Sequence, residues 1–201
     1  MATMECKKCE HAFQTWVPFC PNCAEPVEGY ARPAGFWIRV GAHLVDALIF
    51  SPLIILSFWN MLSFKSMTLM VLIHLPGFLY KPLMESFFGA TLGKMSCKLK
   101  VVNDQCNTLF LFDAYVRSLP FVLSAGIALA SQVVWFSSPQ FQSVTSFVEL
   151  GESKQGGYLD MMSTVVSVLV LIDCAFAAFT FRKRALHDML AESYCVYRDV
   201  A

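Results

Sequence analysis

Residues 36–59 read FWIRVGAHLVDALIFSPLIILSFW, an apolar stretch in which Arg39 and Asp46 are the only acidic or strongly basic residues. About 20 apolar residues are enough for an α-helix to cross the hydrocarbon core of a bilayer. A charged side chain at the bilayer centre costs roughly 2.5–3.5 kcal/mol on insertion scales, so such side chains usually face a protein interior or a pathway. The stretch therefore predicts a membrane-spanning helix whose two charges are sheltered from lipid.

The composition of the whole chain points the same way. Of its 201 residues 56% are hydrophobic and only 15% are charged, which is typical of membrane proteins. Further apolar stretches cover residues 67–88, 115–136 and 161–181. We expect an all-α membrane protein with a four-helix transmembrane bundle. The formal charge is zero, so we expect no nucleic acid partner.

A cysteine-rich segment precedes the apolar part of the chain. Cys6-x-x-Cys9 and Cys20-x-x-Cys23 match the pattern in which four thiolates surround a tetrahedral zinc ion. Four protein ligands close the site, so the expected cofactor is a structural zinc; the alternative is free or redox-active thiols. We expect a zinc-ribbon-like module at residues 1–24, a linker at 25–35 and a transmembrane domain at 36–198.

The distribution of basic residues predicts the orientation, because cytoplasmic flanks accumulate Lys and Arg. With four spans only Lys65 and Lys154 fall in the outer loops. Eleven other basic residues would lie inside or at the inner edge: Lys7, Lys8, Arg32, Lys94, Lys98, Lys100, Arg117, Arg182, Lys183, Arg184 and Arg198. We expect both termini in the cytoplasm, with the protein in the inner membrane if the source is bacterial.

Between the second and third spans the hydrophobic pattern changes. From residue 94 to 101 apolar and polar residues alternate, which is the period of a half-buried strand. Asn103 and Asp104 supply a turn signal, and residues 108–112 would return as a second strand. The pattern predicts a short cytoplasmic β-hairpin.

The ionisable residues inside the spans are the candidates for ion or proton binding. Asp46 has His43 one helical turn before it, and Asp173 is expected at a similar depth in the fourth span. Two carboxylates in a low dielectric would share a proton or a cation. The alternative for Asp173 is a neutral acid that donates to a backbone carbonyl, or a side chain that faces a lipid-accessible groove near Cys174.

A second group of ionisable residues is expected at the inner ends of the spans. Lys81 and Glu85 are spaced i, i+4, and Arg39, Arg117, Arg184 and Asp188 should lie at similar height. Ion pairs among these residues would pin the helix ends together. The alternative is a gate or a docking surface.

Three segments of the sequence resemble the RDD family of membrane proteins, which is named for one Arg and two Asp. Residues 34–46 resemble its first motif, with Arg39 as the Arg and Asp46 as the first Asp. Residues 85–94 resemble the second, from Glu85 to Gly93 and Lys94. Residues 184–191 resemble the last, with Asp188 as the second Asp.

This resemblance implies a helical membrane domain, often preceded by a zinc ribbon. Cation/proton antiport has been proposed for some members of the family, and assembly or adaptor roles for others. The family usually has a basic residue after the Gly-Lys pair, whereas this chain has Met95, which argues against an anion site there.

Two functions follow as hypotheses. The first is a small cation/proton transporter that uses Asp46, His43 and Asp173; four spans are few for alternating access, so it implies a homo-oligomer. The second is a non-catalytic adaptor or assembly factor that recruits a cytoplasmic protein through its zinc module. We expect no enzyme, because the sequence shows no nucleophile–base pair, phosphate-binding glycine loop or open metal site.

Overall fold

The computed structural model describes residues 3–14, 20, 22–23, 25, 27, 33–103, 107–153, 157–180 and 183–198. Most of the expected linker at 25–35 lies outside these residues, as do Arg32, Lys154 and Arg182 of the orientation argument.

Four long helices form most of the described chain. They are α1 (Phe36–Trp59), α2 (Met67–Phe87), α4 (Leu111–Phe136) and α7 (Tyr158–Phe179), and α1 continues into a π-helical turn, Asn60–Phe64. All four are long and apolar enough to cross a membrane. The predicted all-α membrane fold is therefore confirmed. Helix α4 begins at Leu111 and not at residue 115, and α7 covers 158–179 and not 161–181.

Short elements connect the long helices, and the chain divides into two compact units. The first unit comprises Met1–Asp46, Lys81–Ser118 and Asp173–Ala201, and the second comprises Ala47–Tyr80 and Leu119–Ile172. The short elements of the first unit are β1 (Thr3–Glu5), β2 (Ala12–Gln14), α3 (Leu92–Ser96), β3 (Leu99–Asn103), α8 (Leu186–Leu190) and β4 (Ser193–Tyr197). Those of the second unit are α5 (Pro139–Ser143) and α6 (Phe147–Ser153).

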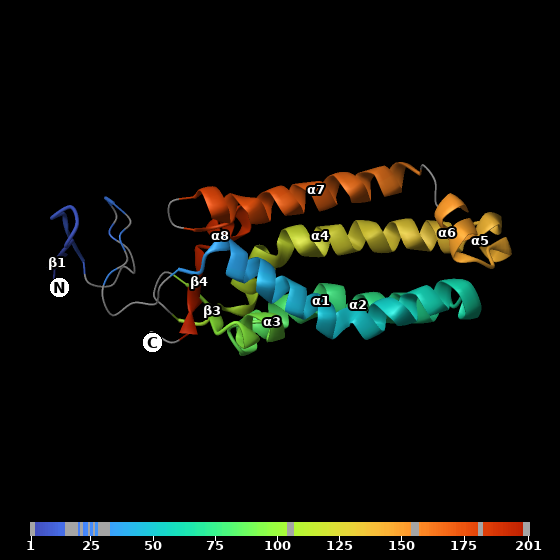
Figure 1. The fold of residues 1–201 in the computed structure, drawn as a ribbon, viewed down its shortest axis with the longest axis horizontal. Helices are drawn as coiled ribbons and strands as arrows, with labels where there is room; N and C mark the ends of the chain where they lie inside the picture. Colours follow the sequence, from blue (N-terminus) through green and yellow to red (C-terminus); the bar gives the residue numbers. More distant parts are fainter. Residues whose placement is uncertain are drawn as a thin grey trace. The chain divides into compact units, whose positions relative to one another are not determined.

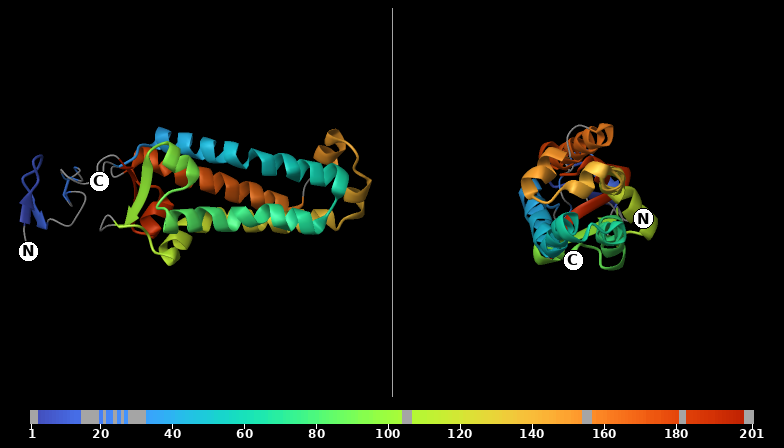
Figure 2. Two further views of the ribbon diagram at one scale, coloured as in Figure 1. Left: turned by 90° about the horizontal axis from the view of Figure 1, so that it is seen from below. Right: turned by 90° about the vertical axis from the view of Figure 1, so that its right-hand side faces the viewer.

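Strand β3 of the first unit confirms part of the predicted hairpin, but its predicted partner is wrong. β3 pairs antiparallel with β4, with Leu99 opposite Tyr197 and Asn103 opposite Ser193. The segment expected to return as a strand leads into α4 instead, and Asn103 exchanges hydrogen bonds with the backbone of Asn107 just before it. Figures 1 and 2 show β3 and β4 with α3 and α8 around the helix ends of the first unit.

The predicted strand also begins later than expected. Residues 92–96 form α3, whose N-terminus is capped by the Thr91 hydroxyl accepting from the amide of Lys94 at 3.3 Å. A side-chain cap satisfies one of the backbone donors that a helix start leaves unpaired. Residues 94–96, which alternate like a strand, are therefore helical.

Helix α3 packs against α1 through Asp46 and Gly93. The two carboxylate oxygens of Asp46 accept from the Thr91 hydroxyl and the Gly93 amide, each at 2.7 Å. A Cβ placed on Gly93 would overlap the carbonyl oxygen of Ala42 and lie 2.8 Å from Cγ of Asp46. Only glycine lets the two backbones approach this closely.

The second unit has its own apolar core. The buried members are Met61, Met70, Trp135, Phe136, Phe141, Val144 and Leu150. The ring of Phe141 stacks on Phe136 with a centroid distance of 4.1 Å, which holds α5 against the end of α4. Asn60 fastens the turn before α2 by hydrogen bonds to the backbone of Ser66. Figure 1 shows α5 and α6 side by side.

The contact at Gly93 generates a stability prediction. Gly93→Ala should destabilise the protein by about 1–3 kcal/mol, because the added methyl group overlaps backbone that cannot move freely. Thermal unfolding in detergent measures the effect. The matched control is Gly41→Ala, where an added Cβ meets nothing within 4 Å. Equal melting temperatures for the two variants would contradict this account of the α1–α3 contact.

Candidate functional site

A buried carboxylate, that of Asp188, lies at the centre of the candidate site. Its Oδ2 lies 2.5 Å from Nη1 of Arg39, and its Oδ1 lies 2.8 Å from Nη2 of Arg117. Oδ2 also accepts from the amide of Ala185 at 3.2 Å, which secures the first turn of α8. One side chain therefore connects α1, α4 and α8.

Glu85 is a second buried acid and extends these contacts to two more helices. Its Oε1 lies 2.5 Å from Nζ of Lys94 in α3, and its Oε2 lies 3.1 Å from Nε of Arg117. Arg117 also donates to the hydroxyl of Ser193 at 2.9 Å. We call Arg39, Glu85, Lys94, Arg117 and Asp188 the charge network. Each member comes from a different helix.

His187 joins a third acid to this network. Its Nδ1 lies 2.5 Å from Oδ2 of Asp173, and its Nε2 lies 3.1 Å from Oδ1 of Asp188. An ionised carboxylate only accepts hydrogen bonds, and a neutral imidazole has only one N–H donor. Both contacts are hydrogen bonds only when the ring carries two protons or when one acid is protonated.

Electrostatics keep Asp188 ionised despite its burial. Burial alone would raise its pKa, but Arg117 and Arg39 beside it hold the pKa of Asp188 well below its usual range. The network contains three cations and two carboxylates, so its positive groups are only partly neutralised by its own acids.

A cavity of about 30 Å³ adjoins the network, which is enough room for one water molecule. Its polar lining includes Arg39, His43, Lys94, Arg117 and His187. The structure thus places His43 beside the same space as His187, although the two residues are far apart in the sequence.

The structure places the other predicted site residues as follows. The carboxylate of Asp46 binds Thr91 and Gly93, whereas that of Asp173 accepts from both the ring and the amide of His187. Among the described residues, Asp46 and Asp173 therefore bind different partners. Asp173 accepts a backbone N–H, whereas the neutral-acid alternative required it to donate to a carbonyl.

Glu85 and Arg184 also have partners other than those expected. The ion pairs of Glu85 are with Lys94 and Arg117, whereas the i, i+4 spacing favoured Lys81. Arg184 donates to the backbone carbonyl of Asp188 at 3.0 Å and lies over the ring of Tyr194.

The chain is similar to known proteins over most of its length. A family model described as "RDD family" matches residues 33–192. The chain belongs to the RDD family. YckC of Bacillus subtilis (strain 168), which is named as an uncharacterized protein, is 26% identical over 167 residues, covering 83% of this chain and 85% of its own length. No solved structure matches the chain.

In this RDD protein the residues assigned to the family pattern have two different roles. Arg39 and Asp188 form a direct ion pair across 149 positions of sequence. Asp46 is not part of that pair and holds α3 in place instead. Four apolar helices and the family assignment together identify an integral membrane protein.

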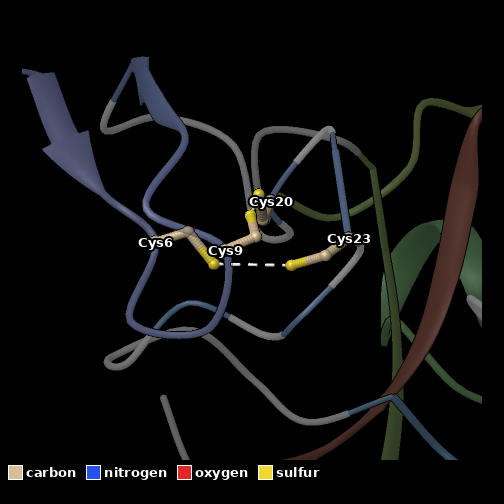
Figure 3. Close-up of side chains that lie close together, drawn as sticks. All are labelled: Cys6, Cys9, Cys20 and Cys23. Carbon is tan, nitrogen blue, oxygen red and sulfur yellow. Dashed lines mark hydrogen bonds between the residues drawn. The ribbon is translucent and has the colours of Figure 1, made fainter.

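The four N-terminal cysteines lie outside the residues that the RDD model matches. Their sulfur atoms are all within 4.8 Å of one another, with Cys6 and Cys23 3.4 Å apart (Figure 3). Backbone amides of Lys8 and Cys9 donate to the Cys6 sulfur and lower its pKa. This cysteine cluster has the geometry to bind a metal ion.

Sequence reasoning missed the polar residues that complete the site. Thr91 could have been found from its position three residues before Lys94, which is typical of a helix N-cap. Ser193 carried no such signal, because its role depends on β4 pairing with β3. The hydrogen bond between His187 and Asp173 joins α8 to α7, and no periodic pattern in the sequence indicates it.

Asp188→Asn is the substitution that tests the network. It should destabilise the protein by about 3–5 kcal/mol, because it leaves Arg39 and Arg117 buried without one of their acids. Chemical or thermal unfolding in detergent measures the loss. The control is Asp113→Asn in the first turn of α4, where the carboxylate is outside the network.

The pH dependence of that stability follows from the lowered pKa of Asp188. Its contribution is complete above the ordinary aspartate pKa of about 3.9 and is lost as the pH falls toward the depressed value of the folded state. Below about pH 4 the wild type should therefore lose stability more steeply than Asp188→Asn. Parallel pH profiles would show that Asp188 is not ionised in the folded protein.

Proposed function

We propose that this RDD protein is a small proton-coupled cation transporter and that His187, held between Asp173 and Asp188, is its proton-binding centre. The observation that carries the proposal is the imidazole with a carboxylate at each ring nitrogen, at 2.5 and 3.1 Å. Histidine is the side chain that most often serves as a proton shuttle in proteins. Buried ionisable groups in membrane proteins commonly mark ion pathways and proton relays.

Proton exchange at His187 would act directly on the charge network. Asp188 is shared by His187, Arg39 and Arg117, so a proton lost from the ring weakens one of the three interactions that neutralise this acid. Asp188 is then neutralised by the two arginines alone. Arg39 belongs to α1 and Arg117 to α4. The protonation state of the His187 ring would therefore change how tightly these two helices are held to α8.

His43 and the water-sized cavity extend the proposed proton path. The cavity is lined by both His43 and His187 and has room for one water molecule. Asp46 enters this proposal as the clamp of α3 and not as a cation ligand. Both its oxygens already accept hydrogen bonds that a cation would have to displace.

The proposal retains the orientation and assembly inferred from the sequence. Both termini would lie in the cytoplasm, which puts the charge network at the inner end of the spans. Four spans are few for alternating access, and in a homo-oligomer a second copy of the chain would supply further helices that can move. We assign no enzymatic reaction to the chain.

The transport proposal predicts that purified protein in proteoliposomes moves protons when a Na⁺ or K⁺ gradient is imposed. His187→Gln and Asp173→Asn should reduce this flux to the rate of empty liposomes, because neither variant retains the shared proton. A pH-sensitive dye inside the vesicles measures the flux. Asp113→Asn serves as the control and should transport like the wild type. Wild-type flux in folded His187→Gln would refute the assignment.

A second candidate function is a membrane adaptor, and the cysteine cluster is the observation that favours it. Four thiolates within 4.8 Å suit a tetrahedral zinc ion, which is closed to substrate and therefore structural. In a segment this small the metal would supply most of the folding energy. The folded module would then present a surface to a cytoplasmic protein.

Metal analysis tests this second candidate. The purified wild type should contain one zinc ion per chain, and Cys6→Ser or Cys20→Ser should lose it, because three remaining thiolates bind zinc far more weakly. Elemental mass spectrometry measures the metal content. Cys97→Ser, which changes a cysteine outside the cluster, is the matched control and should keep its zinc. Equal metal content in Cys20→Ser would exclude a four-cysteine zinc site.

A further inference from the structure

Helix α8 in the first unit has two faces of opposite character. His187 and Asp188 are buried in the charge network and its surroundings, whereas Leu186, Met189 and Leu190 are exposed, Leu190 by 65%. The three apolar residues are spaced i, i+3 and i+4, so they share one face of the helix. This apolar face of α8 points away from the residues that hold its polar face.

The backbone of α8 lies beside α7 and not beyond its end (Figure 1). The amide of His187 donates to Oδ1 of Asp173 at 2.9 Å. Asp173 is six residues before the end of α7 at Phe179, which is about 9 Å along the axis at 1.5 Å per residue. Because an aspartate side chain is short, this bond keeps α8 near the level of Asp173. The chain therefore turns back after α7.

Helix α3 has a similar position beside α1. The amide of Gly93 donates to Asp46, and a Cβ on Gly93 would lie 2.0 Å from the carbonyl oxygen of Ala42. Ala42 and Asp46 are six and ten residues after the start of α1, about 9 and 15 Å along its axis. Leu92, the first residue of α3, is exposed. Both short helices thus lie alongside long helices, well inside their ends.

The ends of the long helices in the first unit expose aromatic side chains. Trp37 at the start of α1 is 81% exposed, Phe112 at the start of α4 is 76% exposed, and Phe179 at the end of α7 is 87% exposed. Such surface is unfavourable in water, and Trp is enriched at membrane interfaces. These turns also belong to helices that are long and apolar enough to cross a membrane. The lipid around the helices therefore extends to these end turns.

A segment inside the hydrocarbon must satisfy its backbone N–H groups within the protein, because no water is present there. The first turns of α3 and α8 have such partners. Side chains accept from four of their amides: Asp46 from Gly93, Thr91 from Lys94, Asp173 from His187, and Asp188 from Ala185. Three of these acceptors are carboxylates, which bind N–H donors more strongly than neutral groups do.

We propose that α3 and α8 are re-entrant segments, which enter and leave the membrane on the same side, and that the apolar face of α8 contacts lipid acyl chains. This face is exposed at a level where α7 is itself surrounded by lipid, so it continues the membrane-facing surface of the protein. The exposed side chain of Leu92 extends the same contact to α3. The charge network then lies inside the membrane boundary and is covered there by two short helices.

The strand pair lies on the other side of this boundary. Val196 of β4 forms an antiparallel bridge with Pro33, three residues before the start of α1. Because the two segments run in opposite directions, the chain from Val196 to Arg198 leads away from α1. The amide of Arg198 donates to the carbonyl of Lys98, and both side chains are exposed. Charged side chains at this level face water or lipid headgroups.

Site-specific photo-crosslinking in nanodiscs tests the lipid contact in the full chain. A benzophenone amino acid replaces Leu190, and the nanodiscs contain phosphatidylcholine with an alkyne on one acyl chain, which a fluorescent azide detects. Irradiation should attach lipid at position 190 as strongly as at Leu169, a residue of α7 that is 56% exposed. The same amino acid at Lys98 is the control and should capture much less lipid.

Two results would overturn the proposal. Capture at position 190 as weak as at position 98, with strong capture at position 169, would place α8 in water. Capture of a second copy of the chain in place of lipid would show that the apolar face of α8 is an interface between protomers. Met189 provides a second position on the same face, so a folding defect at one position does not decide the outcome.

This test is independent of proton transport. It measures which molecules surround α8, whereas the flux assay depends on the chemistry of His187 and Asp173. A protein without proton flux can still capture lipid at position 190, and the reverse also holds.

Discussion

The first unit depends on one buried carboxylate that two guanidinium groups share. Removing charged groups from water is expensive, and their mutual attraction compensates for this only when the geometry is good and the remaining donors are satisfied. Each oxygen of Asp188 lies within 3 Å of an arginine nitrogen, and Oδ2 also accepts a backbone amide. Both arginines therefore have a carboxylate oxygen of Asp188 as a partner inside the unit.

That constraint explains why elements distant in the sequence meet. Arg39 precedes Asp188 by 149 residues, and Arg117 connects Asp188 to Glu85 and Ser193. The short strand pair brings residues 193–197 beside residues 99–103, so the chain just after α8 is held at the same helix ends. The charge network and the strand pair thus fix the same group of helix ends by two different kinds of bond.

The sequence predicted the elements whose signal is local. Four apolar stretches were long enough to span a membrane, and the helices formed there with small changes at their ends. The strand at Leu99 was predicted from its alternation, but its partner was not, because β4 lies almost 100 residues further along the chain. Asp46 was expected deep in the membrane with a distant acid, yet a glycine and a threonine after α2 reach it first. No periodicity encodes such a close approach of two backbones.

The two units differ in how they treat polar groups, and this difference bears on function. In the first unit the buried charges have partners within the chain, so a proton or ion can act there only by exchanging with an existing interaction. In the second unit Gln132 retains a buried acceptor beside a large apolar cavity. A network of ion pairs that share their acids responds to a change in protonation by redistributing these contacts.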